Sequence, residues 1–332
     1  MIRDNDRKSG GKMTDAHVRP AALDDTAAIS ALFRAPISVW QRLDARGRVE
    51  DVPYADLTIY ERWLHGGPWM SLETAAIQLG QLLSGAGLAL VAEAGGQVAG
   101  YLEAYHGVEP SPFGDHVHLA HLVVGPDAAH TGVEQALLAG LFEQAAAMKA
   151  RHVTVSRIGE TPGETSFYER YHLQTLCRIR RLSLSARTGQ IFYRATEHSN
   201  ADPAQIQGWH MTVGRLTSAR QEWEQLWPRT WEIIPQVRQQ RSHRLHLAAA
   251  GQEAYICCRQ QLYDPRSADV SCWSAKPLTN QLVSAIRDWG HREGYRTLQW
   301  VVADDTVKVL GPEAEVGGYT VETCLLLPLE AS

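Results

Sequence analysis

The chain has 332 residues, 44% hydrophobic and 21% charged, which is enough for two globular domains that each bury a core. Its 32 Lys and Arg residues and 37 Asp and Glu residues give a formal net charge of −5, with no block of basic residues. This balance disfavours a nucleic-acid partner, and the absence of an apolar run of roughly 18 residues disfavours a membrane-spanning segment.

The N-terminal residues, 1–16, are polar and lack the apolar core of a signal peptide, so they are expected to form a disordered tail. The cysteines contain no CxxC pair and lie among apolar, strand-like residues: Cys177, Cys257, Cys258, Cys272 and Cys324. We therefore expect buried, reduced thiols and a cytoplasmic location.

The first half of the chain predicts a mixed α/β sheet. In chain order we expect a strand, three helices, three strands, a helix, a strand, a short helix and a strand. Their ranges are His17–Ala21, a helix ending at Phe33, Tyr54–Leu64 within an otherwise irregular stretch, Ser71–Leu83, Leu88–Glu93, Gln97–Tyr105, His116–Val124, Gly132–Lys149, His152–Ser156, Pro162–Arg170 and Gln174–Leu184. Gly95-Gly96 is typical of a two-residue hairpin turn. The strand–helix–strand element around Gly132 implies a right-handed parallel crossover.

The second half repeats this order in weaker form after a polar turn at Ala186–Gly189. The expected elements are a strand, two or three helices, a hairpin, a strand, a helix and two strands, the last of which closes the sheet. Their ranges are Ile191–Ala195, helices within Gln205–Gln239, Arg244–Ala250, Glu253–Tyr263, Asp269–Ser274, Leu278–Glu293, Thr297–Val302 and Tyr319–Leu327. A repeat of this length predicts two tandem copies of one fold, in domains covering 17–186 and 190–332.

Three segments carry a family resemblance. The strand His116–Val124, the loop that follows it and the helix from Gly132 resemble the acetyl-CoA motif of GNAT acetyltransferases, in which Arg/Gln-x-x-Gly-x-Gly/Ala opens a helix. Val18–Ala21 resembles the family's start, and Phe167–Arg170 resembles its Phe-Tyr-Glu-Lys/Arg motif. The resemblance implies two tandem GNAT folds, the C-terminal copy being degenerate, because it matches in element order only.

The same resemblance implies an acetyl-CoA site. A helix N-terminus presents unpaired N–H groups and partial positive charge, and glycine lets a pyrophosphate approach them. Backbone groups of Leu122, Val123 and Val124 are expected to contact the pantetheine and thioester. The residues expected beside the pyrophosphate are those of the loop and the helix start: Ala129, His130, Thr131, Gly132, Val133 and Glu134.

Two of these residues depart from the family pattern. Ala129 stands where Arg or Gln is expected, and Glu134 stands where Gly or Ala is expected. Thr131 and Glu134 also form the sequence pattern of a capping box. A carboxylate beside the pyrophosphate costs on the order of 1 kcal/mol near a surface. A weakened acetyl-CoA site and a plain capped helix without cofactor therefore both remain open.

The resemblance and the strand pattern also suggest catalytic residues. Tyr168 occupies the position of the family's thiolate-protonating tyrosine, although His172 and Leu173 follow where the family has Gly-Phe. His118, which shares one strand face with His116, is the first candidate for the base because imidazole titrates near neutral pH, and Glu103 is the second. Each could instead be a core or polar-face residue. No set of residues has the pattern of a metal site.

The sequence as a whole predicts an acetyl-CoA-dependent N-acetyltransferase in which a small-molecule primary amine attacks the thioester directly. No cysteine lies in the cleft motifs to act as nucleophile. An inactive GNAT scaffold that binds a ligand or protein is the alternative, and a peptide acceptor or a homodimer is also compatible.

In the second half Asp269–Ser274 reaches the next helix through Ala275–Pro277, with Pro277 expected in its first turn. Without a glycine-rich loop, this half is expected to be structural.

Overall fold

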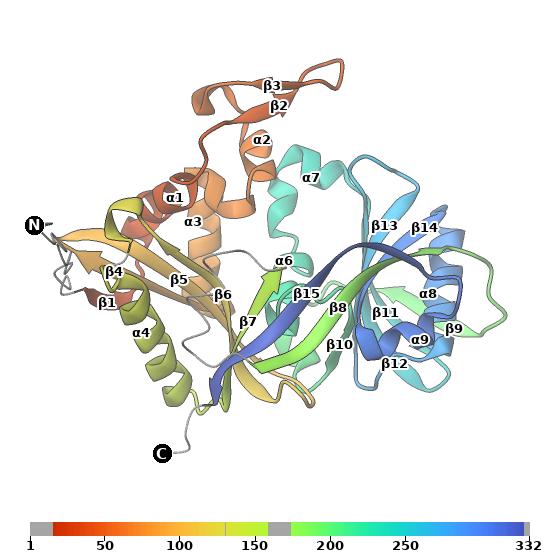
Figure 1. Ribbon diagram of the computed structural model, residues 1–332. Coiled ribbons are helices and arrows are strands. Elements are labelled where there is room, and N and C mark those ends of the chain that lie inside the picture. Colours follow the sequence, from red (N-terminus) through yellow and green to blue (C-terminus); the bar gives the residue numbers. More distant parts are fainter. Residues whose placement is uncertain (1–15, 130, 159–173, 329–332) are drawn as a thin grey trace, which may run out of the picture. The chain divides into compact units, whose positions relative to one another are not determined.

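The computed structural model describes residues 16–129, 131–158 and 174–328 (Figure 1). The chain divides into two compact units: unit 1 comprises Met1–Glu103 and His121–Gln144, and unit 2 comprises Ala104–Ala120 and Ala145–Ser332. The division falls inside strands β5 (Gln97–Val108) and β6 (Asp115–Val124), which contribute residues to both units. Residues 1–15 of the predicted tail and the predicted helix 162–170 lie outside the described residues.

Unit 1 has the strand order β1-β4-β5-β6, with helices on both faces. Its remaining elements are β1 (His17–Pro20), α1 (Thr26–Arg34), the hairpin β2 (Gln41–Leu43) and β3 (Val49–Asp51), α2 (Ile59–Leu64), α3 (Leu72–Gln81), β4 (Leu88–Ala94) and the start of α4 (Val133–Ala147). The hairpin predicted at Gly95-Gly96 is confirmed, with both glycines at positive φ between β4 and β5.

Glycine allows α4 to pack closely against β5. A Cβ atom at Gly100 would lie 2.7 Å from Val133 Cγ1 and 2.9 Å from Leu137 Cδ1, distances that real Cβ atoms do not adopt. The first turns of α4 therefore rest directly on the backbone of β5. Tyr101 alternates to the other face of the strand, where it contacts Trp69 with ring centroids 5.0 Å apart.

Unit 2 has the strand order β5-β6-β7-β15-β8-β14-β13-β12-β11-β9, and β10 pairs with β13. Its elements are β7 (His152–Ile158), β8 (Gln174–Ser185), β9 (Tyr193–Glu197), β10 (His210–Val213), α6 (Ala219–Leu226), α7 (Pro235–Gln239), β11 (Ser242–Ala249), β12 (Gln252–Gln260), β13 (Ser267–Ser274), α8 (Asn280–Arg292), β14 (Thr297–Ala303), α9 (Val307–Leu310) and β15 (Glu315–Pro328). Two parallel strand pairs, β6–β7 and β13–β14, flank the central antiparallel strands β15 and β8.

The position of β15 corrects one prediction. Tyr319–Leu327 does not close the sheet as an outer strand, because β15 lies between β7 and β8. Strand β8 in turn pairs with β14 from the second half of the chain. Each half of the chain thus places its last strand beside a strand of the other half. Unit 2 therefore includes residues on both sides of the predicted boundary at Ala186–Gly189.

Several local predictions are also corrected. Tyr54–Leu64 is not one helix: a 3-10 turn at Tyr54–Asp56 precedes α2, whose cap is Thr58. The short strands β2, β3 and β10 are absent from the predictions because three- or four-residue strands leave little periodicity to detect. Helix α8 begins at Asn280 with Thr279 as its cap, so Pro277 precedes the first turn.

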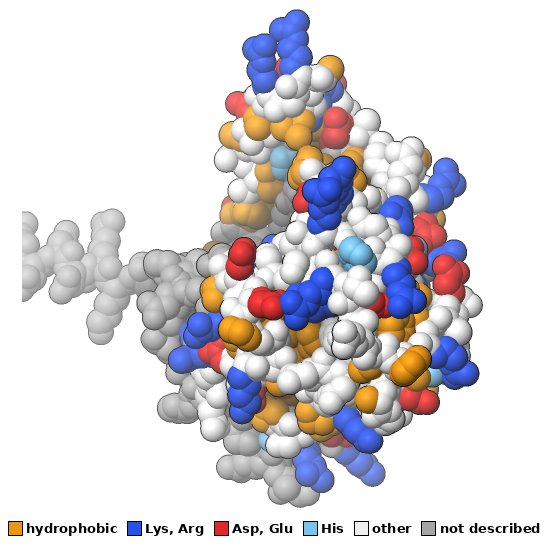
Figure 2. All heavy atoms as spheres, turned by 90° about the vertical axis from the view of Figure 1, so that its right-hand side faces the viewer, with side chains coloured by type: hydrophobic (Ala, Val, Ile, Leu, Met, Phe, Trp, Pro, Cys, Tyr) orange, Lys and Arg blue, Asp and Glu red, His pale blue; other side chains and the backbone are white. Residues whose placement is uncertain are grey.

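The side chains of unit 2 form two buried clusters. One packs one face of strands β11–β14 against α8, and the other, which includes Cys257 and Trp273 from the opposite face, contains Trp223 and Trp227 beside α6. Four of the five cysteines are buried, and all five are free thiols. The face of the molecule drawn in Figure 2 carries Lys and Arg side chains interspersed with acidic and apolar ones. Over the described part of the chain, no helix is both long and apolar enough to cross a membrane.

Candidate functional site

Strand β6 carries most of the predicted site residues, and its environment changes along its length. From His116 to Leu119 it is buried and pairs in parallel with His152–Val155 of β7. From Ala120 to Val124, beyond the paired residues, it is only half-buried. The predicted pantetheine contacts, Leu122, Val123 and Val124, therefore lie on the more accessible end of the strand.

The loop after β6 is ordered by its own backbone. The Gly125 N–H donates to the Ala99 carbonyl at 2.9 Å, and the Thr131 hydroxyl donates to the Ala128 carbonyl at 2.6 Å. The Thr131 N–H also donates to Ala128, at 3.2 Å. The predicted capping box is therefore wrong, because Thr131 bonds backward into the loop and does not bond Glu134. Gly132 has φ 97°, a left-handed conformation that glycine favours, and α4 starts after it at Val133.

In this geometry the N–H groups that could face a pyrophosphate belong to the start of α4 and not to Thr131. Since the Thr131 N–H is already paired, the open N–H groups belong to the first turn of α4, beginning at Val133. Glu134 is the second helical residue and brings its carboxylate to the same turn. Ala129 is exposed and supplies no polar side chain, and His130 lies outside the described residues. The backbone at the start of α4 fits a pyrophosphate, and among the described residues of the loop and first turn no side chain is a cation.

Glu103, the second candidate base, is held in the interior of unit 1. Its side chain accepts hydrogen bonds from Trp69 Nε1 at 2.9 Å, Gln78 Nε2 at 3.1 Å and the Tyr101 hydroxyl at 3.3 Å. Glu103 is 1% exposed, so these donors replace water around the carboxylate. The contacts are those of a structural carboxylate. They also place Trp69, which is 1% exposed, in the core.

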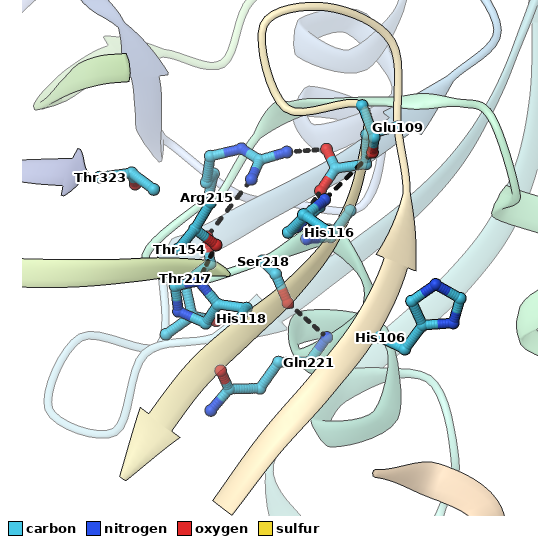
Figure 3. Close-up of polar contacts among 12 residues, drawn as sticks. His106, Glu109, His116, His118, Thr154, Arg215, Thr217, Ser218, Gln221 and Thr323 are labelled. Carbon is cyan, nitrogen blue, oxygen red and sulfur yellow. Dashed lines mark hydrogen bonds and ion pairs between the residues drawn. The ribbon is translucent and has the colours of Figure 1, made fainter. Parts of the chain in front are cut away.

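His118, the first candidate base, is buried in unit 2. Its Nδ1 lies 2.9 Å from the Thr154 hydroxyl, which occupies the directly opposite position on β7 (Figure 3). When Nδ1–H donates to Thr154, the Nε2 atom carries the lone pair that a general base needs. The residue is 1% exposed, so its ring is fixed by packing as well as by this hydrogen bond.

His116 belongs to a second, fully buried polar cluster in unit 2. Its Nδ1 donates to the Gly114 carbonyl at 3.1 Å, and its Nε2 lies 3.6 Å from Glu109 Oε1. The Glu109 carboxylate forms an ion pair with Arg215, and their side chains are 2% and 5% exposed. Figure 3 shows the three side chains pointing toward one another, with His106 directed away. Gly107 makes room for the ring, since a Cβ there would lie 3.3 Å from His116 Cε1.

The same cluster anchors helix α6. Glu109 Oε1 accepts a hydrogen bond at 3.2 Å from the N–H of Ala219, the first residue of α6. The Arg215 guanidinium lies over the Phe113 ring at 4.0 Å and donates to the Thr217 carbonyl at 3.3 Å. One carboxylate thus satisfies a guanidinium and a helix N-terminus, which is how a buried charge is tolerated.

The cluster makes stability depend on pH. Burial lowers the pKa of the His116 imidazole below its usual value. The Arg215 guanidinium also lowers this pKa, whereas the Glu109 carboxylate raises it. The unfolded chain therefore takes up this proton at a higher pH than the folded protein. The stability that neutral His116 contributes is present above about pH 6.5 and is lost as the pH falls below it, by at most about 1.4 kcal/mol per pH unit.

We expect His116→Gln to weaken the loss of stability between pH 7.5 and pH 5.5. His210 and His243 also have lowered pKa values, caused mainly by burial, so the variant keeps part of the dependence. Urea unfolding of both proteins across this range checks the prediction through the slope of unfolding free energy against pH. Equal slopes would show that His116 is not protonated differently on unfolding.

Sequence reasoning missed Glu109 and Arg215, which lie 106 positions apart in the chain. Each stands in a loop where a charged residue is normally solvated, so no local signal identified them. Tyr168 falls outside the described residues, and its role stays a prediction. Within the described ranges, no group of three or more His, Cys, Asp or Glu residues could hold a metal ion.

Comparisons with known proteins agree with the geometry. Residues 53–172 match the model of the acetyltransferase (GNAT) family, and no curated protein matches the sequence. The fold is similar to a GCN5-related N-acetyltransferase from Anabaena variabilis, with 13% identity, a TM-score of 0.60 and coverage of 93% of this chain and 72% of that one. It is also similar to a GCN5-related N-acetyltransferase from Kribbella flavida, with 13% identity, a TM-score of 0.52 and coverage of 94% and 71%. Residues 53–172 therefore resemble the GNAT family in sequence, and the chain as a whole has the fold of GNAT acetyltransferases.

Proposed function

We propose that this protein is an acetyl-CoA-dependent N-acetyltransferase that acetylates a small-molecule primary amine. The observation that carries the proposal is the course of β6 into α4. The half-buried strand end Leu122–Val124 leads through an ordered loop and left-handed Gly132 to a helix start with open N–H groups. This is the arrangement of backbone that binds a pyrophosphate without needing a cation.

The residues would share the reaction as follows. The first turn of α4 holds the cofactor's phosphates, and backbone groups of Leu122–Val124 hold the pantetheine arm. His118 accepts the proton of the amine as its nitrogen attacks the thioester carbonyl. The carbon–sulfur bond then breaks, and Tyr168 gives a proton to the leaving thiolate. Direct attack requires only these two proton transfers, and no cysteine is needed as an intermediate acceptor.

The second candidate function is a catalytically inactive scaffold with a GNAT fold. Ala129 and Glu134 favour it, because they replace a polar side chain and a small residue in the expected pyrophosphate loop. The second half of the chain supports a structural role: β13 leads to α8 through a short segment, and Thr279 caps the helix by accepting the Leu282 N–H at 3.2 Å. We propose that this half is a degenerate tandem copy that does not bind cofactor.

Calorimetric titration of the purified protein with acetyl-CoA and with free CoA tests the proposed function. Micromolar binding is expected if the loop and the start of α4 bind the pyrophosphate. An amine panel and a peptide panel then separate a small-molecule acceptor from a protein acceptor. The absence of heat and of thermal stabilisation at millimolar ligand would support the scaffold.

Replacing Glu134 tests whether its carboxylate faces the cofactor. We expect Glu134→Gln to tighten acetyl-CoA binding about fivefold, because it removes a repulsion on the order of 1 kcal/mol while keeping the side-chain volume. Glu143→Gln, on the same helix and away from its first turn, is the matched control and leaves the dissociation constant unchanged. Equal affinities of both variants and the parent would mean that the Glu134 carboxylate points away from the phosphates.

A further inference from the structure

Unit 2 contains a cavity that the proposed reaction does not use. It has a volume of about 210 Å³ and lies between α8, the linker before β9 and the end of α9. Helix α8 supplies Asn280, Ser284 and Arg287, whose spacing of four and three residues places them on one face of the helix. The linker supplies Arg187–Gly189, and the end of α9 supplies Lys308–Gly311.

The walls of this cavity are fixed by buried hydrogen bonds. Asp288, 1% exposed, accepts the Gly189 N–H at 2.8 Å and the Tyr193 hydroxyl at 2.8 Å, which holds the linker on α8. The contact is close: a Cβ atom at Gly189 would lie 2.8 Å from Ser284 Oγ. The cavity is therefore preformed, and no loop must be ordered when a ligand binds.

The cavity carries an excess of positive charge. Arg187, Arg287 and Lys308 line it, and the Glu313 carboxylate accepts Arg187 Nη1 at 2.6 Å and Arg287 Nη2 at 3.1 Å. Both arginines lower the pKa of Glu313, so it stays ionised at neutral pH. The other carboxylate of the wall, Asp288, is paired with Arg292, which does not line the cavity, so the three lining cations outnumber the carboxylate that two of them share.

Two of the cations keep donors for a ligand. Arg287 is 5% exposed and uses Nε and Nη2 to bond Ser185 and Glu313, whereas its Nη1 makes no hydrogen bond with the described residues. The Lys308 ammonium likewise makes no hydrogen bond or ion pair within those residues and is exposed. A guanidinium held by its neighbours in this way presents its remaining donors in a fixed direction, which suits an oxyanion.

The lining also includes three apolar side chains beside the polar ones. Val283 and Leu310 are buried, and Val309 is half-buried. A cavity of about 150 Å³ holds benzene, so this one accommodates an anionic group together with a short hydrocarbon segment. We propose that this cavity binds a small organic carboxylate, with Arg287 and Lys308 on the carboxylate and Val283 and Leu310 on the hydrocarbon part.

Nuclear magnetic resonance titration of the full chain tests the proposal, with the backbone signals of Gly189 and Gly311 as reporters. Butyrate, inorganic phosphate and butylamine are the probes. We expect butyrate to shift both signals along a saturable curve, phosphate to bind at least threefold more weakly, and butylamine to produce no saturable shift. Phosphate binding as tightly as butyrate, or a saturable shift with butylamine, would overturn the assignment.

Two variants separate the site from general charge effects. Lys308→Gln is expected to weaken butyrate binding at least threefold with an unchanged melting temperature, because Lys308 is exposed and makes no structural contact. Arg229→Gln, an exposed cation of unit 2 outside the cavity lining, is the matched control and should leave the curve unchanged. Equal butyrate affinity of Lys308→Gln and the parent protein would reject the site. Acetyl-CoA titration of Lys308→Gln is expected to match the parent, so the two sites are tested separately.

Discussion

Glu109→Gln is expected to destabilise the protein by about 3–5 kcal/mol, the largest effect on stability of any single substitution considered. The variant leaves the Arg215 guanidinium buried opposite a neutral amide, and it weakens the bond to the Ala219 N–H at the start of α6. Urea unfolding followed by tryptophan fluorescence measures the change, and Trp273, whose Nε1 donates to the Ala219 carbonyl at 3.1 Å, is among the ten tryptophans that contribute to the signal.

A double-mutant cycle separates the ion pair from a loss of packing. Arg215→Gln alone should cost a similar amount, and Glu109→Gln with Arg215→Gln should cost less than the sum of the two, because no unpaired charge remains. Asp304→Asn is the control: it breaks the exposed ion pair with Arg180 and should change stability by less than about 1 kcal/mol. Additive effects of the two buried substitutions would mean that Glu109 and Arg215 do not stabilise each other.

The elements near the proposed cofactor site follow from local sequence patterns. Alternation along β6 placed His116 and His118 on one face, and both are buried in unit 2. His121, farther along the same strand, contacts Phe33 in unit 1 with ring centroids 5.2 Å apart. The alternation of a strand and the periodicity of a helix are set by residues that are close in the sequence. They therefore predict a strand or helix correctly when one of its faces is buried.

The features that sequence patterns missed are non-local. Hydrophobic periodicity identified β15 as a strand but cannot state its neighbours, so its insertion between β7 and β8 was not predicted. The capping-box pattern at Thr131–Glu134 failed because left-handed Gly132 delays the start of α4 by one residue. Both cases show tertiary geometry overriding a pattern that is locally valid.

His118→Gln is expected to lower turnover about 10²- to 10³-fold at saturating acetyl-CoA, with little change in the affinity for the cofactor. Glutamine can keep a hydrogen bond to the Thr154 hydroxyl, but it cannot accept the proton of the attacking amine. The rate at acid pH identifies the role: in the parent protein it should fall as the imidazole becomes protonated, and in the variant this limb should disappear.

The neighbouring histidine provides the matched control for this prediction. His116→Gln changes a buried imidazole on the same strand face, but His116 Nε2 faces Glu109 inside the cluster that anchors α6. Its turnover per folded molecule should therefore stay within about twofold of the parent at neutral pH, while its stability changes. Thr154→Val should retain the acid limb and lose about tenfold in rate, because the ring remains but its orientation is no longer fixed. Loss of turnover in His116→Gln, with full activity in His118→Gln, would move the general base from His118 to His116.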